Sequence, residues 1–131
     1  MILGPLDHFT ILTSQARMPA LEKFYREVLG LIAGPRPDFP FPGRWLYNGD
    51  KAVLHVVATL DDGAAPVPVG ECIEHVAFKA GDAAAFRAKL AALNIDYRDA
   101  QRPLAGYQIF LRDPAGVRVE LNFGDERAQG A

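Results

Sequence analysis

Three histidines and one glutamate have the types and the spacing of metal ligands. His8 in "LDHFTI" aligns with His75 in "IEHVAF", and His55 in "AVLHVV" aligns with Glu120 in "VRVELN". Imidazole nitrogen and carboxylate oxygen bind divalent zinc, nickel, iron, cobalt or manganese at about 2.0 to 2.2 Å, and this mixture of ligands selects none of them strongly. The four residues therefore predict one divalent metal ion of unspecified identity, held by His8, His55, His75 and Glu120.

The structural alternative is common for any one of these residues. A single histidine in an apolar run is usually satisfied by a backbone partner, and a glutamate on a strand is usually solvated. The structural alternative explains four such residues at matching positions of a repeat less well, because residues with unrelated structural roles rarely occupy equivalent positions. The repeat therefore favours a ligand cluster.

The first half of the sequence predicts a strand, a helix and a hairpin. Residues 6–12 alternate between apolar and polar side chains, and residues 18–31 carry apolar residues at helical spacing. The segment that follows holds four prolines in "AGPRPDFPFPG" and predicts an extended loop. Residues 44–58 then predict a hairpin that turns at Asn48-Gly49.

The second half repeats this series. Residues 72–80 alternate again, and Asp82 is a suitable N-cap for a helix over 83–94. Strands are predicted over 106–112 and 117–123, joined by a type I turn at "DPAG". Each half is thus a strand, a helix and a set of strands, which is an internal repeat.

Side-chain alternation places the candidate ligands on one face of each strand. The apolar residues on the opposite faces suit the apolar stripes of the helices, so the candidates point away from the helices toward a partly polar face. We interpret that face as the wall of a cleft. The opposite faces carry Phe9, Ile11, Leu54, Val56, Val76, Phe78, Val119, Leu121 and Phe123.

Composition and charge exclude several classes of protein. With 50% hydrophobic and 23% charged residues, the chain has ordinary globular usage. The net charge of −2, with signs interspersed, gives no basic stripe for nucleic acid. No apolar run approaches the roughly 18 residues of a spanning helix, and the N-terminus lacks a secretion signal, so we expect a cytoplasmic protein without a membrane partner. Cys72, the one cysteine, excludes intrachain disulfides, and its predicted position opposite His75 excludes it as a ligand.

The segment "FLRDPAGVRVELNF", with the "DH" and "EH" of the opening strands, resembles the vicinal oxygen chelate superfamily of glyoxalases, fosfomycin and bleomycin resistance proteins, extradiol dioxygenases and methylmalonyl-CoA epimerases. The resemblance implies an α+β fold of two tandem βαβββ modules that form a curled mixed sheet around a metal-binding cleft. The expected domain covers residues 1–131, with module one at 5–60, a linker at 61–71, module two at 72–124 and a short tail at 125–131.

The resemblance also implies roles for the candidate ligands. His8, His75 and Glu120 match the ligands that are shared most widely in the superfamily, whereas His55 stands where glyoxalases have a glutamate and epimerases a glutamine. Without a second carboxylate, Glu120 is the main acid/base candidate and His55 the second catalytic candidate. A glutathione-dependent glyoxalase is therefore less expected.

Three functions remain open at this point. One is a metal-dependent, glyoxalase-like lyase or isomerase whose small substrate chelates the metal through vicinal oxygens. Another is an Fe(II) extradiol dioxygenase with His8, His75 and Glu120 as its triad and His55 as a nearby acid or base. The third is a non-catalytic, resistance-type protein that binds a small molecule.

The substrate contacts are predicted less sharply. Arg118 shares the strand face of Glu120, and further candidates are Arg36, Trp45, Tyr47 and Tyr107. The register at "DPAG" decides which pair of the penultimate strand faces the cleft, either Tyr107 and Ile109 or Gln108 and Phe110. The resemblance further implies a homodimer, with each site inside one chain or shared between two.

Overall fold

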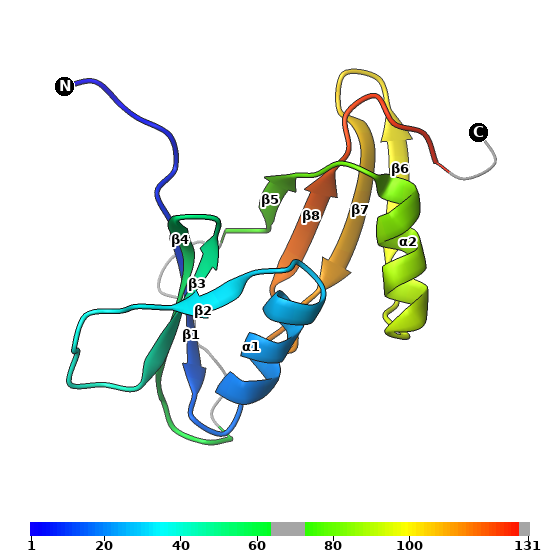
Figure 1. Ribbon diagram of the computed structural model, residues 1–131. Helices are drawn as coiled ribbons and strands as arrows, with labels where there is room; N and C mark the ends of the chain where they lie inside the picture. The colour runs from blue at the N-terminus through cyan, green and yellow to red at the C-terminus, as the bar shows by residue number, and fades with distance from the viewer. Residues whose placement is uncertain (64–72, 129–131) are drawn as a thin grey trace. The chain divides into compact units, whose positions relative to one another are not determined.

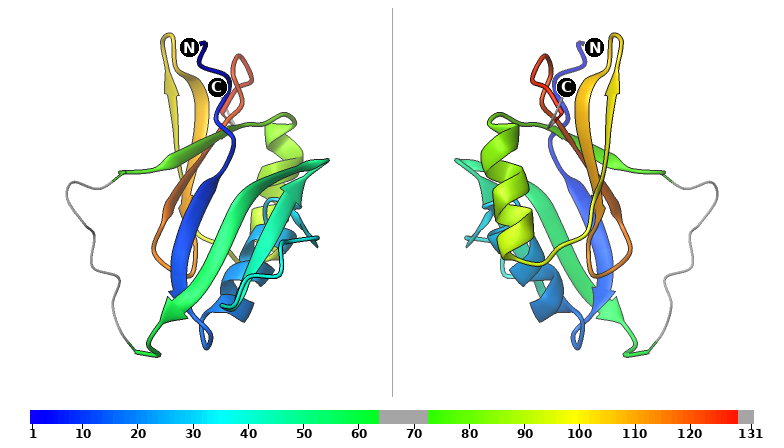
Figure 2. Two further views of the ribbon diagram at one scale, coloured as in Figure 1. Left: turned by 90° about the vertical axis from the view of Figure 1, so that its left-hand side faces the viewer. Right: turned by 90° about the vertical axis from the view of Figure 1, so that its right-hand side faces the viewer.

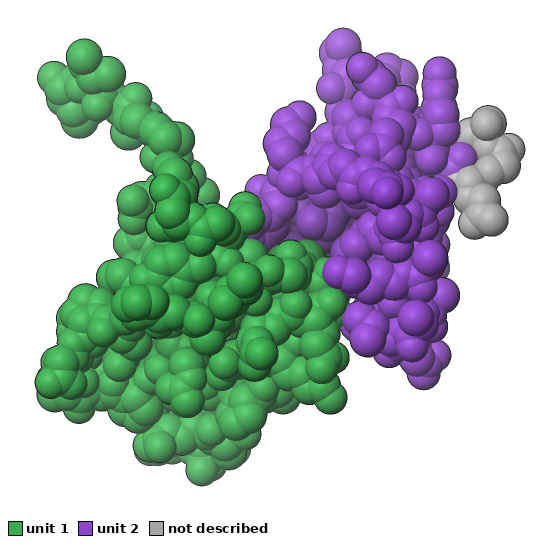
Figure 3. All heavy atoms as spheres, in the orientation of Figure 1, with its two compact units in different colours: residues 1–68 green, residues 69–131 purple. Residues whose placement is uncertain are grey.

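The computed structural model describes residues 1–63 and 73–128. The chain divides into two compact units, unit 1 at Met1–Pro68 and unit 2 at Val69–Ala131 (Figure 3). Most of the predicted linker 61–71, and Cys72 with its predicted orientation, lie outside the described residues. No helix among the described residues is long and apolar enough to cross a membrane.

Unit 1 is one βαβββ module with a four-stranded mixed sheet (Figure 1). The strand order is β1-β4-β3-β2, with β1 parallel to β4 and the other neighbours antiparallel. The long hairpin of β3 and β4 is seen in Figure 2. Its elements are β1 Phe9–Ser14, α1 Met18–Glu27, β2 Ile32–Gly34, β3 Gly43–Asn48 and β4 Lys51–Leu60.

Unit 2 repeats this topology. Its sheet has the order β5-β8-β7-β6, with β5 parallel to β8 and the other neighbours antiparallel. The predicted fold class of two tandem βαβββ modules is therefore confirmed. The elements of unit 2 are β5 Val76–Lys79, α2 Ala83–Ala92, β6 Arg98–Arg102, β7 Gly106–Arg112 and β8 Arg118–Asn122.

The helices form where their signals predict. Pro19 stands in the first turn of α1, and Gly30 has a positive φ of 73° just beyond its end. The helix packs against β2 and β3. In unit 2, the side chain of Asp82 caps α2 by accepting a hydrogen bond of 3.1 Å from the backbone N–H of Ala85. Phe86 of α2 contacts Phe123, with ring centroids 5.8 Å apart.

The apolar faces of the sheets carry the cores of the units, as predicted from side-chain alternation. Burying each large aliphatic side chain contributes roughly 1.5 to 3 kcal/mol. The candidate ligands fall on the other face. In β1, β4, β8 and the residue that follows β8, the buried members of the predicted apolar faces are Ile11, Leu54, Val56, Val119, Leu121 and Phe123.

Two local predictions need correction. His8 does not lie inside a strand, because β1 begins at Phe9 and extends to Ser14. The hairpin does not turn at Asn48-Gly49: Asn48 pairs with Lys51, so the two-residue loop is Gly49-Asp50, with Gly49 at a φ of 63°. A glycine in the first central position accepts that positive angle without steric cost, which sets the register.

Candidate functional site

The two predicted histidines of the repeat occupy the same structural position. His8 directly precedes β1 and His75 directly precedes β5. In unit 1, Thr10 pairs with His55, and in unit 2, Ala77 pairs with Glu120. Each histidine therefore lies two residues before the residue that pairs with the second candidate ligand of the same unit. The two units thus hold their candidate ligands in the same strand register.

In unit 1 the two candidate ligands lie against one another. The rings of His8 and His55 stack with their centroids 3.8 Å apart and their planes 16° apart. Trp45 covers the other ring face of His55 at 4.0 Å, with planes 8° apart, because Trp45 and His55 are paired across β3 and β4. His55 is therefore held between an indole and an imidazole.

This stack limits what His55 can bind. The nitrogen lone pairs of an imidazole lie in the plane of its ring, and a ligand nitrogen must approach the metal to about 2.0 to 2.1 Å. Two nearly parallel rings 3.8 Å apart cannot both direct a lone pair at the same ion. The stack of His8 on His55 would have to open for both rings to bind one metal.

In unit 2 the two candidates lie in direct contact. Nε2 of His75 lies 3.0 Å from Oε2 of Glu120. The Nδ1 of His75 contacts Oε2 of Glu74, whose other carboxylate oxygen lies 2.6 Å from Nη1 of Arg118. The His75 ring therefore lies between two carboxylates, and its Nε2 is the nitrogen directed at Glu120.

Glu120 is buried and is held by two side-chain amides. Its side chain is only 8% exposed. Nε2 of Gln108 donates a hydrogen bond of 2.6 Å to Oε1 of Glu120, and Nδ2 of Asn122 approaches the same oxygen at 3.3 Å. Oε1 of Gln108 is buried without a hydrogen-bond partner among the described residues. The carboxylate is thus fixed in place, and one acceptor beside it is available to a ligand.

Each acidic residue before a histidine contacts that histidine. Nδ1 of His8 lies 2.6 Å from Oδ2 of Asp7, just as Nδ1 of His75 contacts Glu74. An imidazole that donates its Nδ1 proton to a carboxylate presents Nε2 as the metal-binding nitrogen, and the carboxylate fixes its orientation. The chemistry of these donors fits a divalent metal.

The charges around the candidates shift several pKa values. Burial, and then the nearby His8, lower the pKa of His55 below its ordinary value of 6.5. The hydrogen bond with His8 lowers the pKa of Asp7, and those with His75 and Arg118 lower the pKa of Glu74. Folding therefore favours a neutral His55 and ionised Asp7 and Glu74.

The register at "DPAG" places Gln108 and Phe110 on the face of Glu120. Phe110 pairs with Glu120 and Gln108 with Asn122, and Arg118 lies over the Phe110 ring at 4.4 Å. Phe110 thus takes the position in unit 2 that Trp45 takes in unit 1. Gln108 was not among the predicted site residues, because the turn left the register undecided.

Tyr107, a predicted substrate contact, lies on the opposite face of the sheet. Its side chain is fully buried, its hydroxyl donates to Asp99 at 2.8 Å, and Nη1 of Arg87 on α2 donates to that hydroxyl at 3.0 Å. Burial and the hydrogen bond with Asp99 raise the pKa of Tyr107. The alternation of β7 assigns Tyr107 to the side of α2, so it does not join Glu120.

Two further residues predicted to contact the substrate, Arg36 and Tyr47, instead form hydrogen bonds with backbone carbonyls of the Pro-rich loop. Nη2 of Arg36 donates to the backbone carbonyl of Phe41 at 2.9 Å, and its guanidinium lies over the rings of Phe39 and Phe41. The hydroxyl of Tyr47 donates to the backbone carbonyl of Pro35. Arg36 and Tyr47 therefore shape this loop.

Within residues 1–63 and 73–128, no group of three or more histidine, cysteine, aspartate or glutamate side chains has an arrangement that could hold a metal ion. Each unit by itself supplies two of the predicted ligands. The structure brings His8 to His55 and His75 to Glu120.

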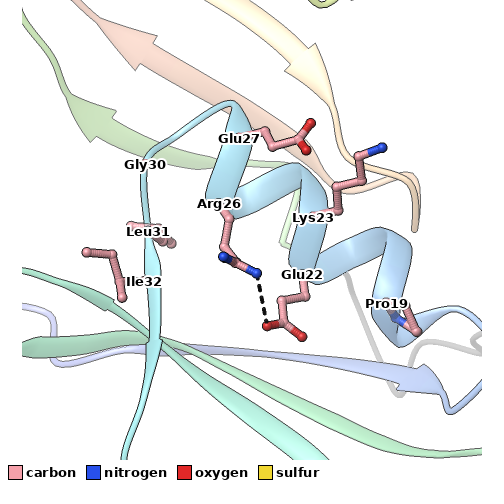
Figure 4. A pocket seen from close by; sticks show the side chains of 8 residues that line it. All are labelled: Pro19, Glu22, Lys23, Arg26, Glu27, Gly30, Leu31 and Ile32. Carbon is pink, nitrogen blue, oxygen red and sulfur yellow. Dashed lines mark ion pairs between the residues drawn. The ribbon is translucent and has the colours of Figure 1, made fainter.

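A cavity of about 540 Å³ lies beside α1 and contains none of the predicted site residues (Figure 4). An ion pair of 3.9 Å between Arg26 and Glu22 crosses its wall. A second cavity, of about 630 Å³, lies in unit 2 and includes Lys79 and Asn122, two positions of the sheet face that carries Glu120. The second cavity is thus adjacent to a predicted ligand.

Comparison with known proteins gives a family and several similar folds. The comparison with curated proteins finds no match. A glyoxalase family protein from Bacillus anthracis is 20% identical with a TM-score of 0.74, covering 95% of this chain and 98% of that one. Lactoylglutathione lyase from Agrobacterium tumefaciens is 24% identical with a TM-score of 0.67, covering 93% and 95%.

A mutant fosfomycin resistance protein from Listeria monocytogenes, complexed with Mn(II) and 1S,2S-dihydroxypropylphosphonic acid, is 12% identical with a TM-score of 0.69, covering 94% of each chain. These structures share the fold. The family model described as Glyoxalase/Bleomycin resistance protein/Dioxygenase superfamily matches residues 6–121. The repeated βαβββ modules and this match lead to one conclusion: the chain belongs to the glyoxalase/bleomycin resistance protein/dioxygenase superfamily.

Proposed function

We propose that the protein is a metal-dependent lyase or isomerase whose small substrate chelates the metal through two adjacent oxygens. The observation that carries this proposal is the contact between Nε2 of His75 and the buried carboxylate of Glu120. Burying a carboxylate costs free energy even when its oxygens have partners, and proteins keep such groups where they have a use. In a protein of this superfamily, metal binding is that use.

His8, His75 and Glu120 would hold the ion, and the stacked His55 would stand beside it. A divalent metal supplies Lewis-acid polarisation of the two substrate oxygens. Glu120, fixed by Gln108, would accept or return a proton, and Arg118, which pairs with Glu74, would contact the substrate. The Mn(II) in the Listeria protein supports a divalent ion as the cofactor.

The stacking of His55 favours a second candidate, an Fe(II) extradiol-type dioxygenase. If His55 stays between Trp45 and His8 and does not bind the metal, two histidines and one carboxylate remain as the predicted ligands. That donor set is typical of non-haem Fe(II) oxygenases, which leave positions open for oxygen and substrate. His55 would then act as a nearby acid or base.

Metal analysis of untagged protein, purified without chelators, tests the proposal. We expect one divalent ion per chain, and we expect His8→Gln, His75→Gln and Glu120→Gln each to weaken binding at least tenfold by competition with a chromogenic chelator. Glu27→Gln, an exposed position on α1, is the matched control. Protein that stays free of metal across Zn, Ni, Co, Mn and anaerobic Fe(II) would overturn the proposal.

Activity assays separate the three functions. Turnover of hemithioacetals or 2-acyl thioesters with Zn, Ni, Co or Mn supports the lyase or isomerase, and His55→Glu should increase it by restoring a second carboxylate. Oxygen uptake over a catechol panel after anaerobic Fe(II) loading supports the dioxygenase. Tight binding of a small molecule without turnover supports a resistance-type protein.

We further propose that the protein acts in the cytoplasm as a homodimer. Light scattering of diluted protein, with and without metal, tests this assembly. A dimer that forms only with metal supports sites shared between two chains.

A further inference from the structure

We propose that the cavity between the β6–β7 hairpin and the segment after β8 binds the anionic group of the substrate, through Lys79, Arg102 and Arg127. This inference rests on the proposed function, because it takes Glu120 as the place where the reacting oxygens bind. It adds a substrate class: a small organic acid with a carboxylate, phosphate or phosphonate remote from its chelating oxygens.

The cavity has a volume of about 630 Å³, enough for a small organic ligand. The β6–β7 hairpin loop and the segment after β8 lie at the same end of unit 2 (Figure 1). Backbone hydrogen bonds join these parts: Tyr107 N–H donates to the carbonyl of Gly124 at 2.9 Å, and Phe123 N–H to the carbonyl of Tyr107 at 2.8 Å. The walls of the cavity are thus fixed by the sheet.

Three cationic side chains line this cavity, against the single carboxylate of Asp125. In the part of the chain that the structure describes, the side chains of Lys79, Arg102 and Arg127 make no ion pair or hydrogen bond. The neighbouring Glu126 is engaged elsewhere, since its carboxylate accepts the backbone N–H groups of Asp82 and Ala83 at 2.9 and 2.7 Å. The cavity therefore has unused positive charge.

The cavity adjoins Glu120 on one face of the sheet. Lys79 pairs with Asn122 across β5 and β8, and Asn122 is two residues from Glu120 along β8. Two residues of a strand span about 7 Å. Nδ2 of Asn122 connects the two places, approaching Oε1 of Glu120 at 3.3 Å and donating to the carbonyl of Ala105 at 3.0 Å.

The charges decide which ligand fits. Ammonium and guanidinium groups bind carboxylates, phosphates and phosphonates through charge-assisted hydrogen bonds, which are stronger than those to neutral groups. A neutral ligand would leave the positive charge of the cavity uncompensated. The separation of the cavity from Glu120 favours molecules whose anionic group is remote from the chelating oxygens.

Inorganic phosphate, added to the metal-free protein, tests the cavity alone. Its affinity is measured from amide chemical shifts in two-dimensional NMR, which also locate the site. We expect shifts at residues 79, 102 and 104–106, and about tenfold weaker binding by the double variant Lys79→Gln/Arg102→Gln, the effect of losing about 1.4 kcal/mol. Lys89→Gln, an exposed cation of α2 outside the cavity, should bind phosphate as the wild type does.

Two probes that differ in one charge test the link to Glu120. The Zn²⁺-loaded protein is titrated with 2-oxoglutarate and with 2-oxopentanoate, in which a methyl group replaces the remote carboxylate. We expect about tenfold preference for 2-oxoglutarate in the wild type and in Lys89→Gln, and loss of this preference in the double variant.

The outcomes distinguish this inference from the proposed function. Three results would overturn the anion site even if Zn²⁺ binds. They are phosphate-induced shifts at other residues, a loss of phosphate affinity in Lys89→Gln equal to that of the double variant, and unchanged phosphate affinity in the double variant. Failure of Zn, Ni, Co, Mn and anaerobic Fe(II) all to bind would overturn the proposed function and the link to Glu120, and the phosphate titration alone would then decide whether the cavity binds anions.

Discussion

At the scale of single residues, Glu120 shows how neighbours prepare a group for chemistry. The carboxylate is buried, yet Gln108 and His75 satisfy both of its oxygens. A buried carboxylate without such partners would be destabilising. The side chains around Glu120 therefore belong to the candidate site as much as Glu120 itself.

Replacing Gln108 should lower stability through Glu120. We expect Gln108→Leu to reduce the free energy of unfolding by about 1 to 3 kcal/mol, because the 2.6 Å hydrogen bond to a buried, charged oxygen is lost. Urea denaturation measures the change, and Gln15→Leu at an exposed position is the control. If Gln108→Leu is as stable as Gln15→Leu, Gln108 does not support Glu120.

His55 should make stability depend on pH. Folding lowers its pKa, so the unfolded chain binds the proton more strongly, and the contribution of neutral His55 is complete above the unfolded value of 6.5 and is lost as the pH falls below it. Urea denaturation at pH 8 and pH 5.5 should show a larger loss for wild type than for His55→Gln. Equal losses in both proteins would contradict this assignment.

The positions of the candidate ligands were predictable from the sequence, but their contacts were not. Alignment of the two halves identifies His8 with His75 and His55 with Glu120, and the strand pairings show the same offset in both units. Stacking of Trp45 on His55 depends on ring orientation, which alternation does not specify. The role of Gln108 depends on a turn register that pattern alone left open.

At the scale of elements, sheet edges were harder to predict than sheet centres. The apolar alternation of β4 and β8 marks them clearly, whereas β2 and β6 were not identified as separate strands from the residues. β6 reads "RDAQR" and is largely exposed at the end of its sheet. An edge strand with little to bury has no apolar periodicity, so only its pairing with β7 defines it.

The start of β7 depends on a glycine that no other residue can replace cheaply. Gly106 has a φ of 77°, and a Cβ there would lie 2.3 Å from the carbonyl oxygen of Gly124. Gly116 has a φ of 86° with open space around it. We expect Gly116→Ala to lower the free energy of unfolding by about 1 to 2 kcal/mol and Gly106→Ala by about 3 kcal/mol or more.

Urea denaturation of the two glycine variants side by side checks this difference. Backbone strain is common to both, so the excess loss in Gly106→Ala measures the clash with Gly124. Equal losses of unfolding free energy in the two variants would show that the hairpin moves enough to relieve the clash with Gly124.

At the scale of the whole molecule, the duplication gives each unit two of the four predicted ligands. One pair, His8 and His55, is formally neutral, and the other, His75 and Glu120, includes a carboxylate. A single ion that takes ligands from both pairs would couple the stability of the two units to metal concentration. Assembly and cofactor binding would then be one equilibrium.

Metal should therefore stabilise the folded protein through both units. At a free Zn²⁺ concentration 100 times the Kd, we expect the free energy of unfolding to rise by about 2.7 kcal/mol. Thermal denaturation with and without Zn²⁺ measures this, and Glu120→Gln and His8→Gln should each lose most of the gain. Glu27→Gln should keep it; stabilisation that survives in Glu120→Gln would place the ion elsewhere.

Because Trp45 stacks on His55, the intrinsic fluorescence of the protein reports on the candidate site. Trp45 is the one tryptophan in the sequence, so all indole emission comes from a ring in contact with the candidate site. A neighbouring imidazole quenches indole fluorescence more strongly once it carries a proton, and separation of the two rings restores the fluorescence. Events at His55 can thus be followed in the unlabelled protein.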